Sequence, residues 1–551
     1  MNFTQLLELL LKYIRVWDAF LYVVHKLRSS NDPMMIISQC LLGGFCLWIV
    51  FRFRTPRKRD LRPGDFEDRL TQFRAGRNPL APKARQVAQD AYTIVRHGGL
   101  NDTDPHMNMT TVVITSPDEG ERAVTDFSTT DFMRQSRSKG SRIAAEGTIA
   151  AFGVGSCGPR GFYGTITPHM DLENHIGEVM RSMINELITK TGKKMALTTD
   201  ESHAAIAYSF GYATISSVIS AFVKHQDYVV YDEAAPSSIQ TGVNLSKSAH
   251  ACAFSSTAVE GGRKPTLDAA IDRLEREAAV QKDDNSHLRR KFIVVEGISA
   301  QRGTLVDLPA VLAVARKHHW RVLIDDSFAI GVLGAKGRGT IEHYADQGLL
   351  SDPAVVEFIR DYVMVTFTFS NALGSIGGAC FGTKESAEFQ TLNGLGYIFS
   401  ASAPPYLCTV ASHSLRTITD ESEADLATLR ENAVYLQDKL VDAGLAVVSD
   451  PICPMKVIEM PFPGSVLPRG VREADGDDLA RFDDVQTRYS RVCKTMRTTG
   501  GYLVDRTVFS ELDPLPLPAR SGVKVNVSSK HSKSEIDGLV RSLKMALDAE
   551  F

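Results

Sequence analysis

The stretch KFIVVEGISAQRGTLVDLPAVLAVARKHHWRVLIDD, residues 291–326, decides the fold class. Its two ends, 291–298 and 321–326, are short runs of β-branched and other apolar residues, typical of buried strands. Between them, residues 307–319 begin with an Asp cap and an early Pro and end in basic residues, which indicates a helix. A strand, a helix and a second strand in this order predict two parallel strands of one sheet.

The same pattern continues outward from this unit. Further strand-like runs occupy 111–116, 228–233 and 362–370, and residues 265–281 show a helical spacing of apolar positions. We therefore predict a large α/β domain over residues 85–405, with a mainly parallel sheet whose carboxyl-terminal edge carries the chemistry. After residue 405 helices and polar-edged strands dominate, which predicts a smaller α+β domain over 406–551.

Composition excludes several classes of protein. The chain has 551 residues, 43% apolar and 23% charged, with a net charge of −3, which is ordinary for a globular protein. Because there is no basic excess, we expect no nucleic-acid partner. The eight cysteines show neither CxxC pairs nor zinc-ligand spacing, so we expect reduced thiols and no metal site.

The N-terminal region predicts a membrane anchor. Eighteen residues from Met34 to Phe51 carry no charge, enough for a helix of about 27 Å, and a basic run follows at once. We expect a transmembrane helix over 34–53, an amphipathic segment over 1–33 that lies on the membrane or binds a partner, and a basic linker over 54–84. The positive flank predicts a single pass with the following domains in the cytosol. A signal peptide and a buried core helix are the alternatives.

A glycine-rich loop opens the large domain. Residues 153–173 read GVGSCGPRGFYGTITPHMDLE, and the first glycines spell G-x-G-x-x-G. A dinucleotide site needs a helix that starts within this motif, and Pro159, Gly161 and Gly164 disfavour one. We therefore reject a nicotinamide cofactor. Taken alone, Cys157 is an ordinary small buried residue and Arg160 an ordinary partner for a carboxylate.

This loop resembles the signature of the α-oxoamine synthase family, whose members join an amino acid to an acyl-CoA with pyridoxal 5'-phosphate. Four more stretches resemble the family in the correct order: VVEGISAQRGTLVDLP (294–309), IDDSFAIGVLGAKGRGTIEH (324–343), TFSNALGSIGGACFG (368–382) and YIFSASAPP (397–405). The resemblance covers roughly residues 85–551 and is greatest to the first long-chain-base subunits of serine palmitoyltransferase. It implies a fold-type I aminotransferase-like fold and a location in the endoplasmic reticulum membrane.

Three positions depart from the family's cofactor-binding residues. Where the family has the imine-forming Lys of T-F-S-K-A-x-G, this chain has Asn371, whose amide nitrogen cannot condense with an aldehyde. Asp325 matches the carboxylate that faces the cofactor's pyridinium, but Phe328 and Pro236 stand where the family has His. The resemblance thus implies no catalytic residue in this chain, and Asp325 as a vestigial structural remnant.

The resemblance implies a heterodimer. A lysine-bearing catalytic subunit would bind pyridoxal 5'-phosphate covalently, and the complex would condense L-serine with palmitoyl-CoA to 3-ketosphinganine, the first step of sphingolipid biosynthesis. From this chain, the expected contributors to the partner's site are Cys157, Arg160, Phe162 and Tyr163, with Ser400 and Ser402 near its cofactor. Two alternatives remain: a homodimeric synthase that uses another lysine, such as Lys384, and a membrane scaffold or regulatory protein.

Overall fold

The computed structural model describes residues 92–98, 108–116, 120–255, 265–280, 289–468, 470–471, 473–509, 515 and 517–551. All of them belong to one compact unit, Val87–Phe551, and the other unit is Met1–Gln86. The segments predicted over 1–33, 34–53 and 54–84 therefore lie outside the described residues. Among the helices that are described, none is long and apolar enough to cross a membrane.

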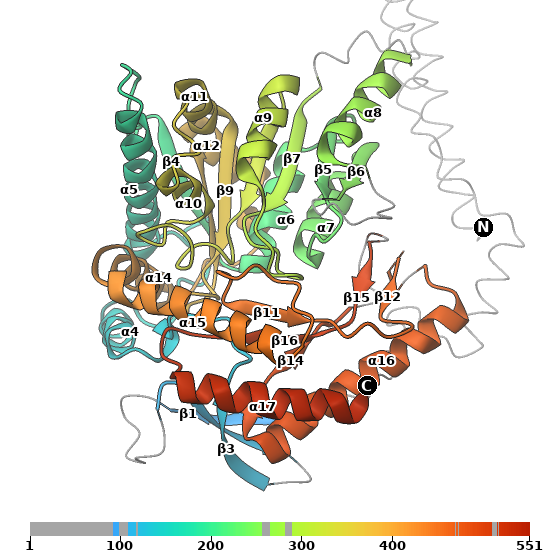
Figure 1. Ribbon diagram of the computed structural model, residues 1–551. Coiled ribbons are helices and arrows are strands. Elements are labelled where there is room, and N and C mark those ends of the chain that lie inside the picture. Colours follow the sequence, from blue (N-terminus) through green and yellow to red (C-terminus); the bar gives the residue numbers. More distant parts are fainter. Residues whose placement is uncertain are drawn as a thin grey trace, which may run out of the picture. The chain divides into compact units, whose positions relative to one another are not determined.

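A seven-stranded sheet forms the centre of the unit (Figure 1). Its strand order is β4-β10-β9-β8-β7-β5-β6. The strands are β4 His203–Tyr208, β5 Tyr228–Asp232, β6 His250–Phe254, β7 Lys291–Glu296, β8 Arg321–Asp325, β9 Val363–Thr368 and β10 Gly378–Thr383. The pairs between β6, β5, β7, β8 and β9 are parallel, and β10 is antiparallel to both of its neighbours. The mainly parallel sheet predicted from the sequence is confirmed.

Alternation along the strands builds a core on each face of the sheet. Ile293 and Val322 point into the core on one face, whereas Val294 and Leu323 point into the core on the other face. A different set of helices covers each face. The first set is α5 Thr167–Lys190, α8 Leu267–Val280, α9 Leu308–His318, α10 Thr340–Asp346 and α11 Pro353–Tyr362. The second set is α6 Gly211–Phe222, α7 Ser237–Ser246 and α12 Lys384–Asn393.

The predicted helix and strand positions in this part are confirmed with small shifts at their ends. The helix expected over 307–319 is α9, whose N-cap Asp307 accepts a hydrogen bond from the backbone N–H of Ala310. It ends at His319, which adopts a left-handed conformation with φ 58°. The helix expected over 265–281 is α8.

Three further helices link the sheet to the rest of the unit. They are α4 Lys139–Phe152, α13 Leu395–Ile398 and α14 Pro405–Arg416. The helix α14 packs against both α4 and α5. The glycine loop thus connects α4 to α5, and both of these helices pack against α14.

Residues from both ends of the unit build the smaller part. The C-terminal elements are α15 Glu423–Asp442, β11 Met455–Ile458, β12 Val466–Leu467, α16 Gly476–Thr495, β13 Tyr502–Leu503, β14 Asp505–Arg506, β15 Ala519–Arg520, β16 Val523–Asn526 and α17 Lys533–Glu550. The strands β1 Thr93–His97, β2 Thr111–Ser116 and β3 Gly120–Asp126 form a sheet with β13. The strand β13 pairs with β3, so the start of the region expected to be the large domain contributes strands here.

Candidate functional site

The carboxyl ends of β8 and β9 bring two predicted site residues together. Asp325 is the last residue of β8, and Asn371 follows the end of β9 by three residues. The two strands are parallel neighbours, with Asp325 opposite Thr366. Both residues therefore lie at the edge of the sheet where α/β proteins bind their ligands.

Asn371 is held by a hydrogen bond on each side of its amide. It is only 5% exposed; its Nδ2 donates to the carbonyl oxygen of Ser327 at 2.6 Å, and its Oδ1 accepts from the Thr130 hydroxyl at 2.8 Å. A buried amide with both ends satisfied is a stable neutral element. This position has no amine, so it cannot form an imine with an aldehyde.

Asp325 is a buried carboxylate that has no ion-pair partner in the described part of the chain. Its Oδ1 accepts from the backbone N–H of Ser327 at 3.1 Å and from the Ser327 hydroxyl at 2.5 Å. No Lys, Arg or His of the described residues forms an ion pair with it. Burial raises its pKa to about 6, although the Ser327 hydrogen bonds oppose this rise. The adjacent Asp326, bound to the Thr340 hydroxyl and backbone N–H, also has its pKa raised to about 6 by burial.

Glu296 and Lys524 belong to the same edge and were not predicted from the sequence. Glu296 ends β7 directly beside Asp325 and accepts from the backbone N–H of Ala300 at 3.0 Å. Burial, with Asp325 nearby, raises the pKa of Glu296 well above its usual value. Lys524 on β16 donates to the carbonyl of Ala300 at 2.8 Å, and burial lowers its pKa. The strand pattern VKVN could have marked Lys524 as half-buried, but only the fold places it beside β7.

The two positions that hold His in the family carry no imidazole here. Phe328 is half-buried, and its ring centroid lies 6.4 Å from that of Phe132. Pro236 is the N-cap of α7, just after β5. Neither side chain has a nitrogen that could donate to or accept from a ligand.

Lys384 lies at the opposite edge of the sheet. The strand β10 starts with Gly378 opposite Thr368 and runs antiparallel to β9, so it ends away from Asn371. Lys384 follows the last residue of this strand. Six strand residues span about 20 Å, and a lysine side chain cannot cover that distance. The amine of Lys384 is therefore unable to replace one at position 371.

The glycine loop is held by very close backbone contacts. Ser402 donates from both its backbone N–H and its hydroxyl to the carbonyl oxygen of Gly158, at 2.9 and 2.7 Å. A Cβ on Gly164 would lie 1.9 Å from that same oxygen, so only glycine fits there. The next helix, α5, begins at Thr167, well after Gly158, unlike the helix start that a dinucleotide motif requires.

Arg160 ties this loop to its own chain. Its guanidinium binds Glu173 in a bidentate pair at 3.0 and 2.8 Å and also donates to the Thr165 hydroxyl. Glu173 accepts a further hydrogen bond from the backbone N–H of Ala207 on β4. Arg160 also lies over the ring of Tyr397, 5.4 Å from its centroid. The structure thus assigns Arg160 internal contacts, and a role toward a partner stays a prediction.

Three other predicted interface residues lie on the outside of the loop. Cys157 and Tyr163 both have positive φ, at 56° and 67°, and both are exposed, Tyr163 completely. The expectation that Cys157 is buried is therefore wrong, because the turn of the loop directs it outward. Phe162 is 64% exposed. Of the two serines, Ser400 donates to the carbonyl of Gly396 at 2.5 Å, and Ser402 is committed to Gly158.

The fold is that of the pyridoxal-phosphate-dependent transferase class. The family model for class I and II aminotransferases matches residues 131–543, so the chain belongs to that family. Within it, the chain is of the long-chain-base, serine palmitoyltransferase type of α-oxoamine synthase, as its relatives show.

Two curated relatives and one solved structure represent this similarity. Serine palmitoyltransferase 1 of Dictyostelium discoideum is 31% identical over 414 residues, 74% of this chain and 74% of the relative. Long chain base biosynthesis protein 1b of Oryza sativa subsp. japonica is 28% identical over 93% of this chain and 91% of its own length. The Sphingomonas wittichii serine palmitoyltransferase structure superposes with a TM-score of 0.60 at 19% identity, covering 88% of this chain and 96% of that one, which supports the fold.

Proposed function

We propose that this chain is the non-catalytic subunit of a serine palmitoyltransferase, which stabilises and completes the active site of a lysine-bearing partner. The complex would condense L-serine with palmitoyl-CoA to 3-ketosphinganine, with pyridoxal 5'-phosphate bound covalently by the partner and not by this chain. One observation carries the proposal. The position that should offer an amine holds an amide whose two ends are engaged by Thr130 and Ser327.

The surroundings of Asn371 support the same proposal. A covalently held pyridoxal phosphate would need an amine at this edge, and Lys384 lies at the other edge. Phe328 and Pro236 offer no polar group to such a cofactor. Asp325 keeps a carboxylate, but its Oδ1 already accepts two hydrogen bonds from Ser327.

An exposed apolar surface beside the site supports a protein partner. It extends over α4, the glycine loop, the start of α6 and α13, and the hydrogen bonds from Ser402 to Gly158 join the loop to the segment after α13. Its members are Phe152, Val154, Phe162, Tyr163, Phe210, Tyr212, Leu395 and Phe399. Phe399 is 78% exposed. Apolar residues clustered in this way typically mark a protein or membrane contact.

We place the complex in the endoplasmic reticulum membrane by the same proposal, with the catalytic part in the cytosol. The support is the uncharged run 34–51 and the basic run after it. Long-chain acyl substrates and lipid products favour an enzyme that lies at a bilayer.

The proposal is tested by locating the cofactor. The full chain is expressed alone and together with a lysine-bearing relative, treated with pyridoxal phosphate, reduced with borohydride and digested for mass spectrometry. We expect the pyridoxyl group on the partner's lysine only. Release of CoA from palmitoyl-CoA and serine should require both chains.

Matched variants sharpen this test. Asn371→Ala should leave the cofactor on the partner's lysine and CoA release measurable, because residue 371 performs no chemistry. Tyr163→Ser, at an exposed position, should weaken co-purification of the two chains, and Met545→Ser on exposed α17 serves as control. A pyridoxyl group on this chain, or turnover by this chain alone, would contradict the proposal. Purification from native membranes without any lysine-bearing relative would favour a scaffold instead.

A further inference from the structure

A second cavity lies at the amino-terminal edge of the central sheet, away from the site described above. It has a volume of about 330 Å³ and is lined by residues that start β7, β8 and β9 and by the start of α12. Arg321 begins β8 and Asp325 ends it, so the two Cα atoms lie about 13 Å apart along the strand. The cavity therefore has no part in the proposed cofactor chemistry.

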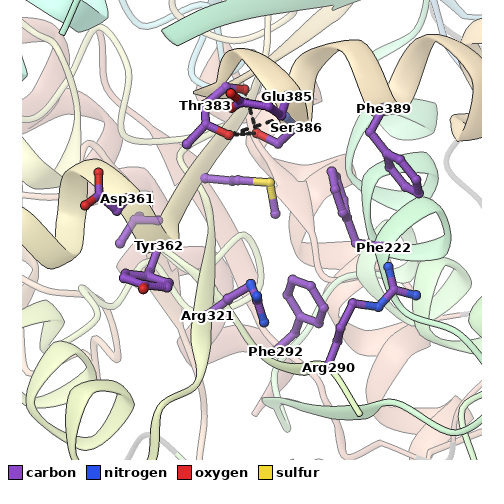
Figure 2. Close-up of a pocket in the computed structure, with 12 residues that line it drawn as sticks. Phe222, Arg290, Phe292, Arg321, Asp361, Tyr362, Thr383, Glu385, Ser386 and Phe389 are labelled. Atoms are coloured by element: carbon purple, nitrogen blue, oxygen red, sulfur yellow. Dashed lines mark hydrogen bonds between the residues drawn. The ribbon is translucent and has the colours of Figure 1, made fainter. Parts of the chain in front are cut away.

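Five of the twelve residues that line the cavity have aromatic or sulfur-bearing side chains. Phe222, Phe292 and Phe389 lie on one side and Tyr362 on the other (Figure 2), and Met364 also lines the cavity. The Phe222 and Phe389 rings lie 5.2 Å apart. Tyr362 and Phe389 are partly exposed, so the cavity opens to solvent. Apolar cavities from about 300 Å³ are typical small-molecule sites, and this one is at the small end of the range.

A larger, more basic depression adjoins this cavity. It measures about 910 Å³, and Arg321, Asp361 and Tyr362 line both, so their side chains form the boundary. Arg316, Lys317 and His319 lie on the basic side. The apolar cavity thus continues into a polar depression, and Arg321 is the one cation of the three residues that line both.

Arg321 is available for an anion. The neighbouring cations are occupied: Arg290 pairs with Asp227 at 2.9 Å, and Lys317 with Asp268 at 2.9 Å. Arg321 is exposed and rests over the Phe292 ring, 5.9 Å from its centroid, and no carboxylate of the described residues forms an ion pair with it. A guanidinium on an aromatic face keeps its donors free for a bidentate carboxylate.

The acidic groups of the cavity fix the direction of such a ligand. Asp361 is already bound by Arg360 at 2.6 and 2.7 Å, which neutralises it. Glu385 lies with Thr383 and Ser386 at the start of α12, across the cavity from Arg321 (Figure 2). A negative head group would be repelled at the Glu385 end and attracted at the Arg321 end.

We propose that this cavity binds an amphipathic monoanion, a carboxylate with a medium-length alkyl chain. The carboxylate lies on Arg321, and the chain lies among Phe222, Phe389 and Met364. The volume suits a medium chain better than a long one, because about 330 Å³ is small for this class of site.

The proposal is tested by photoaffinity labelling of the full chain in the complex in which it purifies. The probes are a ten-carbon carboxylic acid with a diazirine in its chain and the alcohol of the same structure, with decanoate as competitor. We expect the acid to label peptides that contain Phe222, Tyr362 or Phe389, and decanoate to remove this labelling. The variant Arg321→Gln should reduce acid labelling at least fivefold, since it loses the charge-assisted contact. The alcohol should label weakly and to the same extent in both proteins.

Two further variants keep the test decisive. Phe389→Ala, at a partly exposed position, should also reduce labelling by the acid, because it removes part of the chain's contact. Arg481→Gln removes another exposed arginine, on α16, and should change nothing. Labelling that is equal in Arg321→Gln and the unmodified chain, equal for acid and alcohol, or confined to other peptides would overturn the proposal.

Discussion

Two buried carboxylates, Asp126 and Asp325, have opposite electrostatic surroundings. Asp126 ends β3, where Arg134 and Arg137 bind its Oδ2 at 3.0 and 2.8 Å. Burial alone would raise its pKa, but the two arginines and Ser128 lower it to about 2. Asp325 has hydrogen bonds from Ser327 but no cation bound to it among the residues that the structure describes, and burial raises its pKa to about 6. Hydrogen bonds alone therefore do not offset the loss of water around a carboxylate, whereas cations do.

The comparison bears on function because the two settings suit different tasks. The Asp126 cluster joins the first strands to the smaller part, where His531 stacks on Phe127 with ring centroids 3.8 Å apart. It is a structural element. Asp325 lies beside Glu296 and near the amide of Asn371. Lys524 also reaches this edge, but it donates to the carbonyl oxygen of Ala300 and forms no ion pair with Asp325. A buried carboxyl with a raised pKa at a ligand-binding edge is typical of a functional site rather than of a structural ion pair.

The largest effect is expected from breaking the paired cluster. Arg134→Met removes one cation and also the hydrogen bond from Arg134 to the Asp126 carbonyl oxygen. Unfolding free energy should fall by about 3–5 kcal/mol, because one partner of a buried pair is left behind. Urea denaturation of residues 87–551 measures it. The control Arg142→Met breaks an exposed pair with Glu146 and should cost less than about 1 kcal/mol. If Arg134→Met also lost less than about 1 kcal/mol, the arginines could not be the reason that the pKa of Asp126 is lowered while that of Asp325 is raised.

The next effect has the opposite sign. Asp325→Asn should make the folded state more stable by about 3 kcal/mol at pH 8, since the shift from 3.8 to about 6 is about two pKa units and one unit corresponds to about 1.4 kcal/mol. The folded-state pKa of Asp325, about 6, is above the ordinary 3.8, so the unmodified chain carries this cost above pH 6. The cost shrinks as pH falls from 6 and is absent below 3.8. The advantage of the variant should therefore disappear when unfolding is measured at pH 4.

Asp126→Asn is the matched control for that measurement. The folded-state pKa of Asp126, about 2, is below its ordinary 3.8, so its charge stabilises the fold above pH 3.8. This variant should be less stable than the unmodified chain at pH 8, and the gap should close between pH 3.8 and 2. If both variants shift stability in the same direction, the contrast between the two carboxylates is wrong.

A smaller effect is expected at Asn371, the neutral amide near Asp325 that binds Thr130 and Ser327. Asn371→Ala removes one acceptor and one donor and leaves the Thr130 hydroxyl and the Ser327 carbonyl without this partner. The loss should be about 1–2 kcal/mol, and it should not depend on pH because no charge is removed. The exposed amide of Asn393, which donates to the carbonyl of Phe389, is the control, and Asn393→Ala should cost under about 0.5 kcal/mol. A pH-dependent loss would mean that Asn371 interacts with the Asp325 charge.

These residues also show how far the sequence could lead. Strands and helices such as 291–298 and 307–319 follow from local patterns, so their positions could be predicted. The substitution Asn371 was visible because it breaks a local motif. Lys524 and Glu296 are 228 positions apart in the chain, and only the fold brings both to the segment after β7 at Ala300, so no local pattern reveals them. For Arg160 the sequence indicated a carboxylate partner, but only the folded loop identifies that partner as Glu173, 13 positions further along the chain.

The smallest effect is expected for an ion pair that water can reach, between Lys530 and Asp425. Lys530 binds Asp425 at 2.8 and 2.9 Å, yet both side chains are more than a third exposed. Lys530→Met should cost only about 0.2–1 kcal/mol, because solvent replaces the lost cation. Raising the salt concentration to 1 M should remove most of this difference but little of the Arg134→Met loss, since salt screens exposed pairs far more than buried ones. If salt weakened the effects of both variants equally, burial would not protect the Arg134–Asp126 pair from screening, and the account of Asp126 would be wrong.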